Sequence, residues 1–341
     1  MRRRRGLIAV LLAACCLAAW HRDTGGAVRH PVLPIVAPAA AAGDRVIVEP
    51  DDGMSGIDDL LASPRRSLDL TMYELSDPTA ESLLAADAAR GVRVRVILDG
   101  RLEQARNSPA YEFLRSRGVL VEWSSGRFFA THEKAFVVDG AIAVVMSLNL
   151  TSQYYATTRD VAVVDRDPAD VAAIESVFAA DLRGGGSATP AADDLVWSPG
   201  QSSADLLSLI SHARVSVALE SEELSSPSVV DALTGAAKRG VRVTVAMTYA
   251  DDWRPAFERL RAAGVQIHVM YGERPLYLHA KLFAIDAGTP HRVAFVGSEN
   301  LTDASLLHDR ELGLVLLDPT SVGRIATVIA TDFAMSADWT G

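Results

Sequence analysis

Cysteine is almost missing from this chain of 341 residues, which has only Cys15 and Cys16. Both lie near the N-terminus, so the rest of the chain must be stable without disulfides. It also lacks any cluster of cysteine and histidine at the spacing of zinc ligands. Lysine is scarce as well: there are 30 arginines but only three lysines, at positions 134, 238 and 281. An ammonium group is not interchangeable with a guanidinium, so each lysine position asks for an explanation.

Excess positive charge is missing too. The formal net charge is −10, and beyond residues 1–43 there remain 27 basic and 42 acidic residues, a net charge of −15. A nuclease usually carries a basic surface for phosphates, so the composition disfavours nucleic acid as a partner, although a local basic patch stays open. After residue 20, no apolar run is long enough to span a bilayer.

Residues 1–43 differ from the rest. Four arginines at 2–5 precede an apolar stretch at 6–20, a pattern typical of an export signal, and an alanine- and proline-rich spacer follows. Two kinds of processing stay open. The signal could be cleaved after Ala42, or a lipid could be attached to Cys15, which ends a segment (LAAC) similar to a bacterial lipobox. We therefore expect an exported protein, secreted or periplasmic, with lipid anchoring as an option.

The rest of the chain is a duplication. ARGVRV, starting at Ala89, returns as KRGVRV at Lys238, and strand, helix, strand patterns surround both copies. In the first copy the strand Ser67–Leu75 is followed by a helix from Pro78, with Asp77 as its cap, and by a second strand. This order predicts parallel strands joined by a right-handed crossover, and hence two α/β units with mixed sheets. The boundaries we expect are 44–183 for the first repeat, 184–194 for a linker and 195–341 for the second repeat.

One motif occurs in both copies, as HEKAFVVDGAIAVVMSLN at 132–149 and HAKLFAIDAGTPHRVAFVGSEN at 279–300. Asp139-Gly140 is a hairpin signal, and a two-residue turn would pair Val138 with Ala141 and set Ser147 opposite His132. The longer turn of the second copy would likewise keep Ser298 opposite His279. Histidine, lysine, serine and asparagine of each motif should then lie on one face.

This pattern resembles the phospholipase D superfamily, whose mark is a pair of H-x-K-x4-D motifs, each followed by G-S-x-N. Gly297-Ser298-Glu299-Asn300 matches that mark fully, whereas Met146 replaces the glycine in the first copy. The resemblance covers the chain from about Val46 to Leu316. It implies an α/β fold of two duplicated phospholipase D-like α/β/α repeats, with mixed sheets packed about a pseudo-twofold axis and both motifs in one cleft of a monomer.

The chemistry needs a nucleophile, an acid for the leaving alkoxide, and positive charge around the phosphoryl oxygens. One imidazole can attack phosphorus to give a phosphohistidine, and a second can carry the proton. By resemblance, His132 is the nucleophile and His279 the acid/base, with no metal and no cofactor. Asp160 and Glu311, each following an arginine, are placed to fix a histidine tautomer. The expected catalytic residues are His132, Lys134, Asp139, His279, Lys281 and Asp286, and the expected phosphate-binding or supporting residues are Ser147, Asn149, Ser298, Asn300, Asp160 and Glu311.

Some assignments stay open at this stage. Although the motif includes them, Asp139 and Asp286 are better explained by turn capping than by chemistry. Glu74 and Glu223 close equivalent strands and could serve either a site or a strand end.

Three functions remain in view. The first is an exported phosphodiesterase that hydrolyses phospholipids or transfers their phosphatidyl group, with transient or lipid-anchored membrane contact. The second is an exported nuclease with the same chemistry, and the third is a non-catalytic surface-binding protein. A transferase similar to cardiolipin synthase is a variant of the first.

Overall fold

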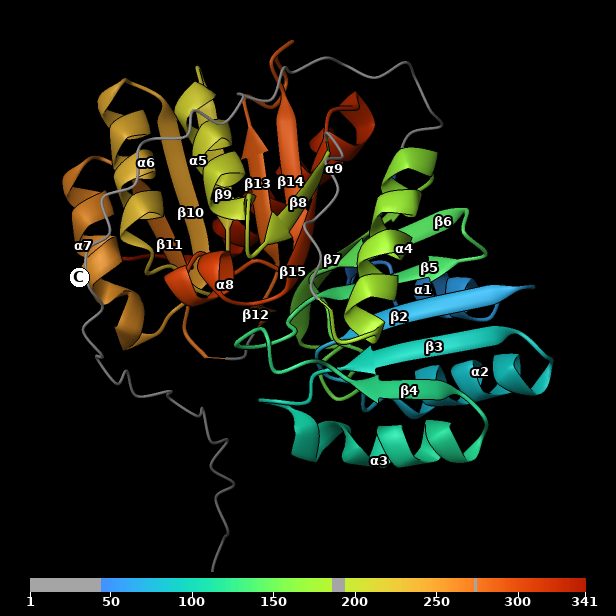
Figure 1. Cartoon of the computed structure of the whole chain (residues 1–341). Helices are drawn as coiled ribbons and strands as arrows, with labels where there is room; N and C mark the ends of the chain where they lie inside the picture. The colour runs from blue at the N-terminus through green and yellow to red at the C-terminus, as the bar shows by residue number, and fades with distance from the viewer. Residues whose placement is uncertain (1–43, 186–193, 273–274) are drawn as a thin grey trace, which may run out of the picture. The chain divides into compact units, whose positions relative to one another are not determined.

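The computed structural model describes residues 44–185, 194–272 and 275–341, and within them the strands form two sheets of eight strands each (Figure 1). The predicted export signal, the spacer and most of the predicted linker lie outside these ranges. In the described ranges, no helix is both long and apolar enough to cross a membrane.

The first repeat contributes these elements: β1 (Arg45–Glu49), α1 (Ser55–Leu61), β2 (Ser67–Met72), α2 (Pro78–Ala89), β3 (Arg93–Leu98), α3 (Gln104–Ser116), β4 (Leu120–Trp123), β5 (Lys134–Val138), β6 (Ile142–Met146), β7 (Thr158–Asp165) and α4 (Pro168–Leu182). The second contributes β8 (Leu195–Ser198), α5 (Ser202–His212), β9 (Ser216–Glu220), α6 (Pro227–Lys238), β10 (Arg242–Thr248), η1 (Asp251–Trp253), α7 (Arg254–Ala262), β11 (Gln266–Met270), β12 (Tyr277–Leu278), β13 (Lys281–Ile285), β14 (Val293–Gly297), α8 (Asp303–Leu307), β15 (Glu311–Leu316), α9 (Pro319–Met335) and β16 (Ala337–Asp338).

Both sheets are mixed, as the strand and helix order predicted. The first runs β1-β7-β6-β5-β2-β3-β4, with β2, β3 and β4 parallel, and the second runs β16-β11-β10-β9-β13-β14-β15-β8, with β9, β10 and β11 parallel. The short strand β12 of the second repeat pairs with β7 of the first. The fold class expected from the sequence is therefore confirmed.

Three of the described helices begin where aspartate precedes proline. Asp77, Asp167 and Asp318 are the N-caps of α2, α4 and α9, and each accepts a backbone N–H two residues on. The proline that follows has no N–H to lose and a φ already suited to a helix. The predicted cap of α2 is confirmed.

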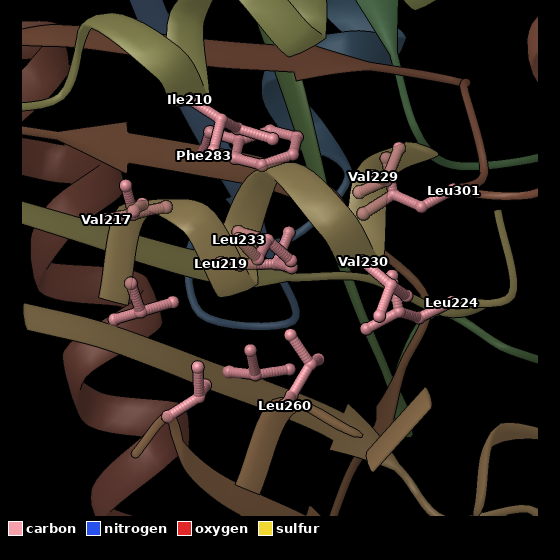
Figure 2. Close-up of a cluster of buried hydrophobic side chains, with 14 of the residues drawn as sticks. Ile210, Val217, Leu219, Leu224, Val229, Val230, Leu233, Leu260, Phe283 and Leu301 are labelled. Atoms are coloured by element: carbon pink, nitrogen blue, oxygen red, sulfur yellow. The ribbon is translucent and has the colours of Figure 1, made fainter. Parts of the chain in front are cut away.

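Three apolar layers hold the repeats. One packs α1–α3 on the outer face of the first sheet, and another packs α5–α7 on the outer face of the second. Figure 2 shows part of the latter, where Ile210 and Leu233 meet Val217, Leu219 and Phe283 from β9 and β13. The third layer lies between the two sheets and includes residues from α4 and α9. Because the inner faces of both sheets are buried together, the motif strands of the two repeats are brought side by side.

Candidate active site

The two motifs begin where a strand of one repeat meets the backbone of the other. His132 and Glu133 both donate their N–H to the carbonyl oxygen of Arg310. His279 and Ala280 donate equivalently to the carbonyl oxygen of Arg159. These matched contacts follow from the pseudo-twofold arrangement, and they fix each histidine next to the acid that follows the arginine in the opposite repeat.

Each histidine is held by a carboxylate from the other repeat. His132 Nδ1 lies 2.9 Å from Glu311 Oε2, and His279 Nδ1 lies 2.7 Å from Asp160 Oδ1. These contacts commit Nδ1 to the carboxylate and leave Nε2 for chemistry. The imidazole side chains are 13% and 12% exposed. The sequence had placed both acids near the histidines without saying that each pair crosses between repeats.

Serine hydroxyls fix the two carboxylates. Ser147 Oγ donates to Asp160 Oδ1 at 2.6 Å, and Ser305 Oγ donates to Glu311 Oε1 at 2.5 Å. Burial by itself would raise the pKa of Glu311, but His132, Lys134 and Ser305 outweigh it and the pKa is lowered. Glu311 is thus an anion that can stabilise an imidazolium.

The motif lysines are buried at the start of β5 and β13. Lys134 Nζ and Lys281 Nζ each donate to the carbonyl oxygen of the histidine two residues earlier, at 2.5 Å. Burial lowers the pKa of Lys134 to about 7, against an opposing contribution from Glu311, and Lys281 lowers it further. Lys281 also lowers the pKa of His132, so charges of the two motifs act on one another in a single site.

One difference between the two halves lies next to the motif lysines. Tyr73 and Glu222 are equivalent, since the leucines two residues after them form the matching bridges Leu75–Leu150 and Leu224–Leu301. The Tyr73 ring lies edge-on to His132, with centroids 4.6 Å apart, and 4.8 Å from Lys134 Nζ. The Glu222 carboxylate instead pairs with Lys281 Nζ at 2.9 Å. Neither residue was singled out from the sequence, although aligning the repeats exposes the exchange.

The predicted register of the motif hairpins is wrong by one residue. Asp139 and Gly140 do form a turn with positive φ, closed by the N–H of Ala141 on the carbonyl oxygen of Val138, but Val138 pairs with Ile142. Ala141 is therefore an extra residue, as in a β-bulge. In the second copy Lys281 pairs with Gly297.

Because of this shift, Ser147 stands across from Glu133, and Ser298 from Ala280, instead of the histidines. The two serines therefore do not share the face of the histidines and lysines. Ser147 accepts the N–H of Val161, and Ser298 accepts the N–H of Leu312. Their hydroxyls support β7 and β15, and so position Asp160 and Glu311, rather than facing a phosphate.

The two motif aspartates also need correction as members of the catalytic set. Asp139 and Asp286 lie in the turns at the far ends of β5 and β13, with φ of 54° and 49°. The Asp139 carboxylate accepts the backbone N–H groups at 65, 66 and 67, and the Asp286 carboxylate accepts those at 214, 215 and 216. Burial would raise the pKa of Asp139, but these N–H groups lower it overall. Both residues anchor the loops that lead into β2 and β9 and do not touch the reacting groups.

The motif asparagines lie at the ends of the return strands. Asn300 Nδ2 lies 3.4 Å from Glu222 Oε2, and Asn149 Oδ1 accepts the N–H of Glu74 at 3.4 Å. Glu74 itself pairs with Arg106 at 2.9 Å. For Glu223, burial and the neighbouring Glu222 raise the pKa to about 7.

We call His132, Lys134 and Glu311 the first half-site, and His279, Lys281 and Asp160 the second. Buried acids beside the first half-site were missed from the sequence. Burial raises the pKa of Glu133 to about 8, and burial with Glu311 nearby raises that of Glu299. A Cβ at Gly297 would lie 2.7 Å from Gly313 Cα, so the motif glycine is required where this acid packs. Met146, its counterpart, is instead fully buried in the outer core. In the sequence, the only sign of this close packing was that Gly297 matches the glycine of the motif.

Comparison with known proteins agrees with this arrangement. A family model described as cardiolipin synthase, PLD-like domain, matches residues 57–182 and 206–335. Cardiolipin synthase A of Pseudomonas aeruginosa is 29% identical over 301 residues, which cover 76% of this chain and 60% of that protein. The chain thus spans less than two thirds of the length of this relative. Mitochondrial cardiolipin hydrolase of Xenopus tropicalis is 37% identical over 121 residues, covering 35% of this chain and 56% of that protein.

The fold is also found among solved structures. Phosphatidylserine synthase from Haemophilus influenzae Rd KW20 superposes with a TM-score of 0.67 and 11% identity, covering 88% of both chains. At this identity the likeness concerns the fold alone. The family model, in contrast, covers most of the chain in two blocks, one for each repeat and each containing one complete motif. The chain therefore belongs to the phospholipase D superfamily, in its family of cardiolipin synthase-like domains.

Proposed function

We propose that this protein cleaves a phospholipid phosphodiester in two steps and passes the phosphatidyl group to water or to an alcohol. The observation that carries the proposal is the pair of histidines, each held through Nδ1 by a carboxylate of the opposite repeat. Two imidazoles held in this way, with Nε2 turned away from these carboxylates, supply the nucleophile and the proton carrier that one phosphorus atom needs.

In the first step, His132 Nε2 attacks phosphorus, and the bond from phosphorus to the leaving oxygen breaks. Protonated His279 gives its Nε2 proton to that oxygen, so the alcohol leaves neutral. In the second step, neutral His279 takes a proton from water or an acceptor alcohol, whose oxygen attacks phosphorus and breaks the phosphorus–nitrogen bond. Lys134, Lys281 and the motif asparagines offset charge on the phosphoryl oxygens.

Burial favours His132 for the attacking role. Burial lowers the pKa of His132, Lys134 lowers it further, and Glu311 opposes them. The ring therefore stays neutral, with a lone pair on Nε2, to a lower pH than a histidine with the ordinary pKa of 6.5. His279 has a carboxylate on both sides, Asp160 at Nδ1 and Glu222 at 3.4 Å from Nε2. Both ring nitrogens of His279 thus face carboxylate oxygens, which orient the ring for proton transfer.

A lipid substrate is supported by the surface beside His132. Leu102, Phe129 and Leu307 are 47%, 38% and 48% exposed. The segments that carry them are adjacent, because the N–H of Phe129 donates to the carbonyl oxygen of His308 and the Arg101 guanidinium lies 4.9 Å from the Phe129 ring. Exposed apolar groups with a cation among them suit the boundary between acyl chains and anionic head groups.

The names of the relatives point to both outcomes of the second step, since one is a synthase and the other a hydrolase. Transfer and hydrolysis differ only in the oxygen that attacks the phosphohistidine. We therefore propose phosphatidyl transfer where a suitable alcohol is present and hydrolysis where water alone is available.

The test is an assay of the purified full chain in EDTA, with phosphatidylcholine vesicles, with and without added glycerol. Parallel reactions contain single- or double-stranded DNA, and His132→Asn and His279→Asn are the matched controls. We expect phosphatidate without glycerol, a glycerol-containing product with it, and no turnover by either variant. Cleavage of DNA alone would refute the lipid assignment, and loss of lipid turnover in EDTA would refute the metal-independent mechanism.

A further inference from the structure

A carboxylate in the second half-site holds the residues assigned to phosphate. Glu222 Oε2 accepts from Lys281 Nζ at 2.9 Å and lies 3.4 Å from both Asn300 Nδ2 and His279 Nε2. Tyr277 donates its hydroxyl to Oε1 at 3.0 Å. Oε2 thus has the contacts that a phosphoryl oxygen would be expected to make.

Glu222 is charged in this setting. Burial by itself would raise its pKa, but His279 and Lys281 outweigh burial and lower the pKa well below the usual range. The titratable and charged groups that face it are His279, Lys281, His132, Lys134, Tyr277 and Glu223. The carboxylate therefore offsets the charge of Lys281, whereas the equivalent Tyr73 brings an uncharged ring next to Lys134.

We propose that Glu222 determines specificity for phosphodiesters, because its negative charge in the second half-site disfavours the second negative charge of a phosphomonoester. The inference rests on the proposed function and adds a reason for the exchange between Tyr73 and Glu222. A phosphodiester carries one negative charge, while a monoester gains a second with a pKa near 6. Hydrolysis of a phospholipid yields such a monoester, so the same repulsion speeds release of that product.

The test uses binding instead of turnover. Glycerol 3-phosphate and dimethyl phosphate are titrated into the full chain by calorimetry, in wild type, Glu222→Gln and Glu222→Ala. Because the repulsion scales with ligand charge, at pH 8 we expect about tenfold tighter glycerol 3-phosphate binding in both variants and about threefold tighter dimethyl phosphate binding. At pH 5, where the monoester carries mostly one charge, its gain should fall to that of the diester.

The controls use neighbouring or equivalent positions that lack the contact of Glu222 with Lys281. Tyr73→Phe, at the equivalent position of the first repeat, should leave the affinity ratio of the two ligands unchanged, and Glu223→Gln should change it less than Glu222→Gln. Equal gains for both ligands at pH 8, or no gain at all, would overturn the inference while leaving the proposed function intact. If neither ligand binds wild type or variant, the phosphate site itself is absent, and both proposals are wrong.

Discussion

The two halves of this site have equivalent backbone arrangements but differ in the side chains that face the histidines. On the first side His132 meets Glu311 and an aromatic ring, and on the second side His279 meets Asp160 and the Glu222 carboxylate. The duplication thus supplies two matched imidazoles, and later exchanges of single residues make them unequal. Such inequality suits a reaction with one nucleophile and one proton carrier.

The inequality extends behind the histidines. Glu133 and Glu299 have raised pKa values because they are buried beside the first half-site, and their counterparts in the other repeat are Ala280 and Leu148. The arginines, in contrast, are matched: Arg159 pairs with Asp332 at 2.6 Å and Arg310 with Asp181 at 2.8 Å. The contacts that join the repeats were kept in both copies, whereas the surroundings of the reacting groups diverged.

The strongest way to break the comparison is to remove one histidine at a time. His132→Ala and His279→Ala should each lower kcat by about 10³- to 10⁴-fold, since each acts on the same phosphorus atom. They should differ in a labelling experiment with radioactive phospholipid. His279→Ala, with a good leaving group, should accumulate label on His132, and His132→Ala should not be labelled. Label retained in His132→Ala would reverse the assigned roles.

The arginine pairs test what joins the repeats. Arg159 and Asp332 are 2% and 0% exposed, so Arg159→Met leaves a buried carboxylate without its partner. We expect a loss of about 3–5 kcal/mol in the free energy of unfolding, measured with urea. Arg159→Met combined with Asp332→Leu should recover much of that loss. A single variant as stable as wild type would show that this pair does not hold the interface.

The sequence predicted the layers better than the register. Asp77-Pro78 and the repeated RGVRV segments were enough to place helices and parallel strands, because caps and periodicity are local signals. The hairpin register failed because Ala141 is an extra residue, and a one-residue bulge leaves no mark in the spacing of Asp139 and Gly140. Because of that error Ser147 was predicted to face the phosphate, whereas its hydroxyl supports Asp160.

The spacing of the motifs could indicate which residues belong to one site, but not which repeat each acid serves. Asp160 follows the first motif and yet binds His279 of the second, since the pairing arises from the packing of two sheets. Glu222 lies outside both motifs. Aligning the repeats shows that it replaces Tyr73, but its contact with Lys281 comes only from the structure. Tertiary contacts of this kind have no local signal in one sequence.

The His132–Glu311 pair should determine how the rate responds to acid. Glu311 raises the pKa of His132 against the effect of burial, so Glu311→Gln should lower that pKa further. If neutral His132 is the nucleophile, the acidic limb of the kcat/KM profile should then move to lower pH. Both Glu311→Gln and Asp160→Asn should reduce kcat by about 10- to 100-fold, the loss expected for a hydrogen bond to a charged group. An acidic limb that stays in place in Glu311→Gln, or moves upward, would assign that limb to another group.

The smallest effect expected concerns the motif aspartates, and it tests their removal from the catalytic set. Asp139→Asn weakens the anchoring of the N–H groups at 65, 66 and 67, so the free energy of unfolding should fall by about 1–2 kcal/mol, while kcat of the folded protein changes less than threefold. The pKa of Asp139 is lowered in the folded state, so its contribution is present above the ordinary 3.8 and is lost as the pH falls below it. The stability difference between wild type and Asp139→Asn should therefore shrink in acid, and Asp286→Asn serves as the matched variant. A loss of kcat comparable with that of His132→Ala, with the fold intact, would return these aspartates to the chemistry.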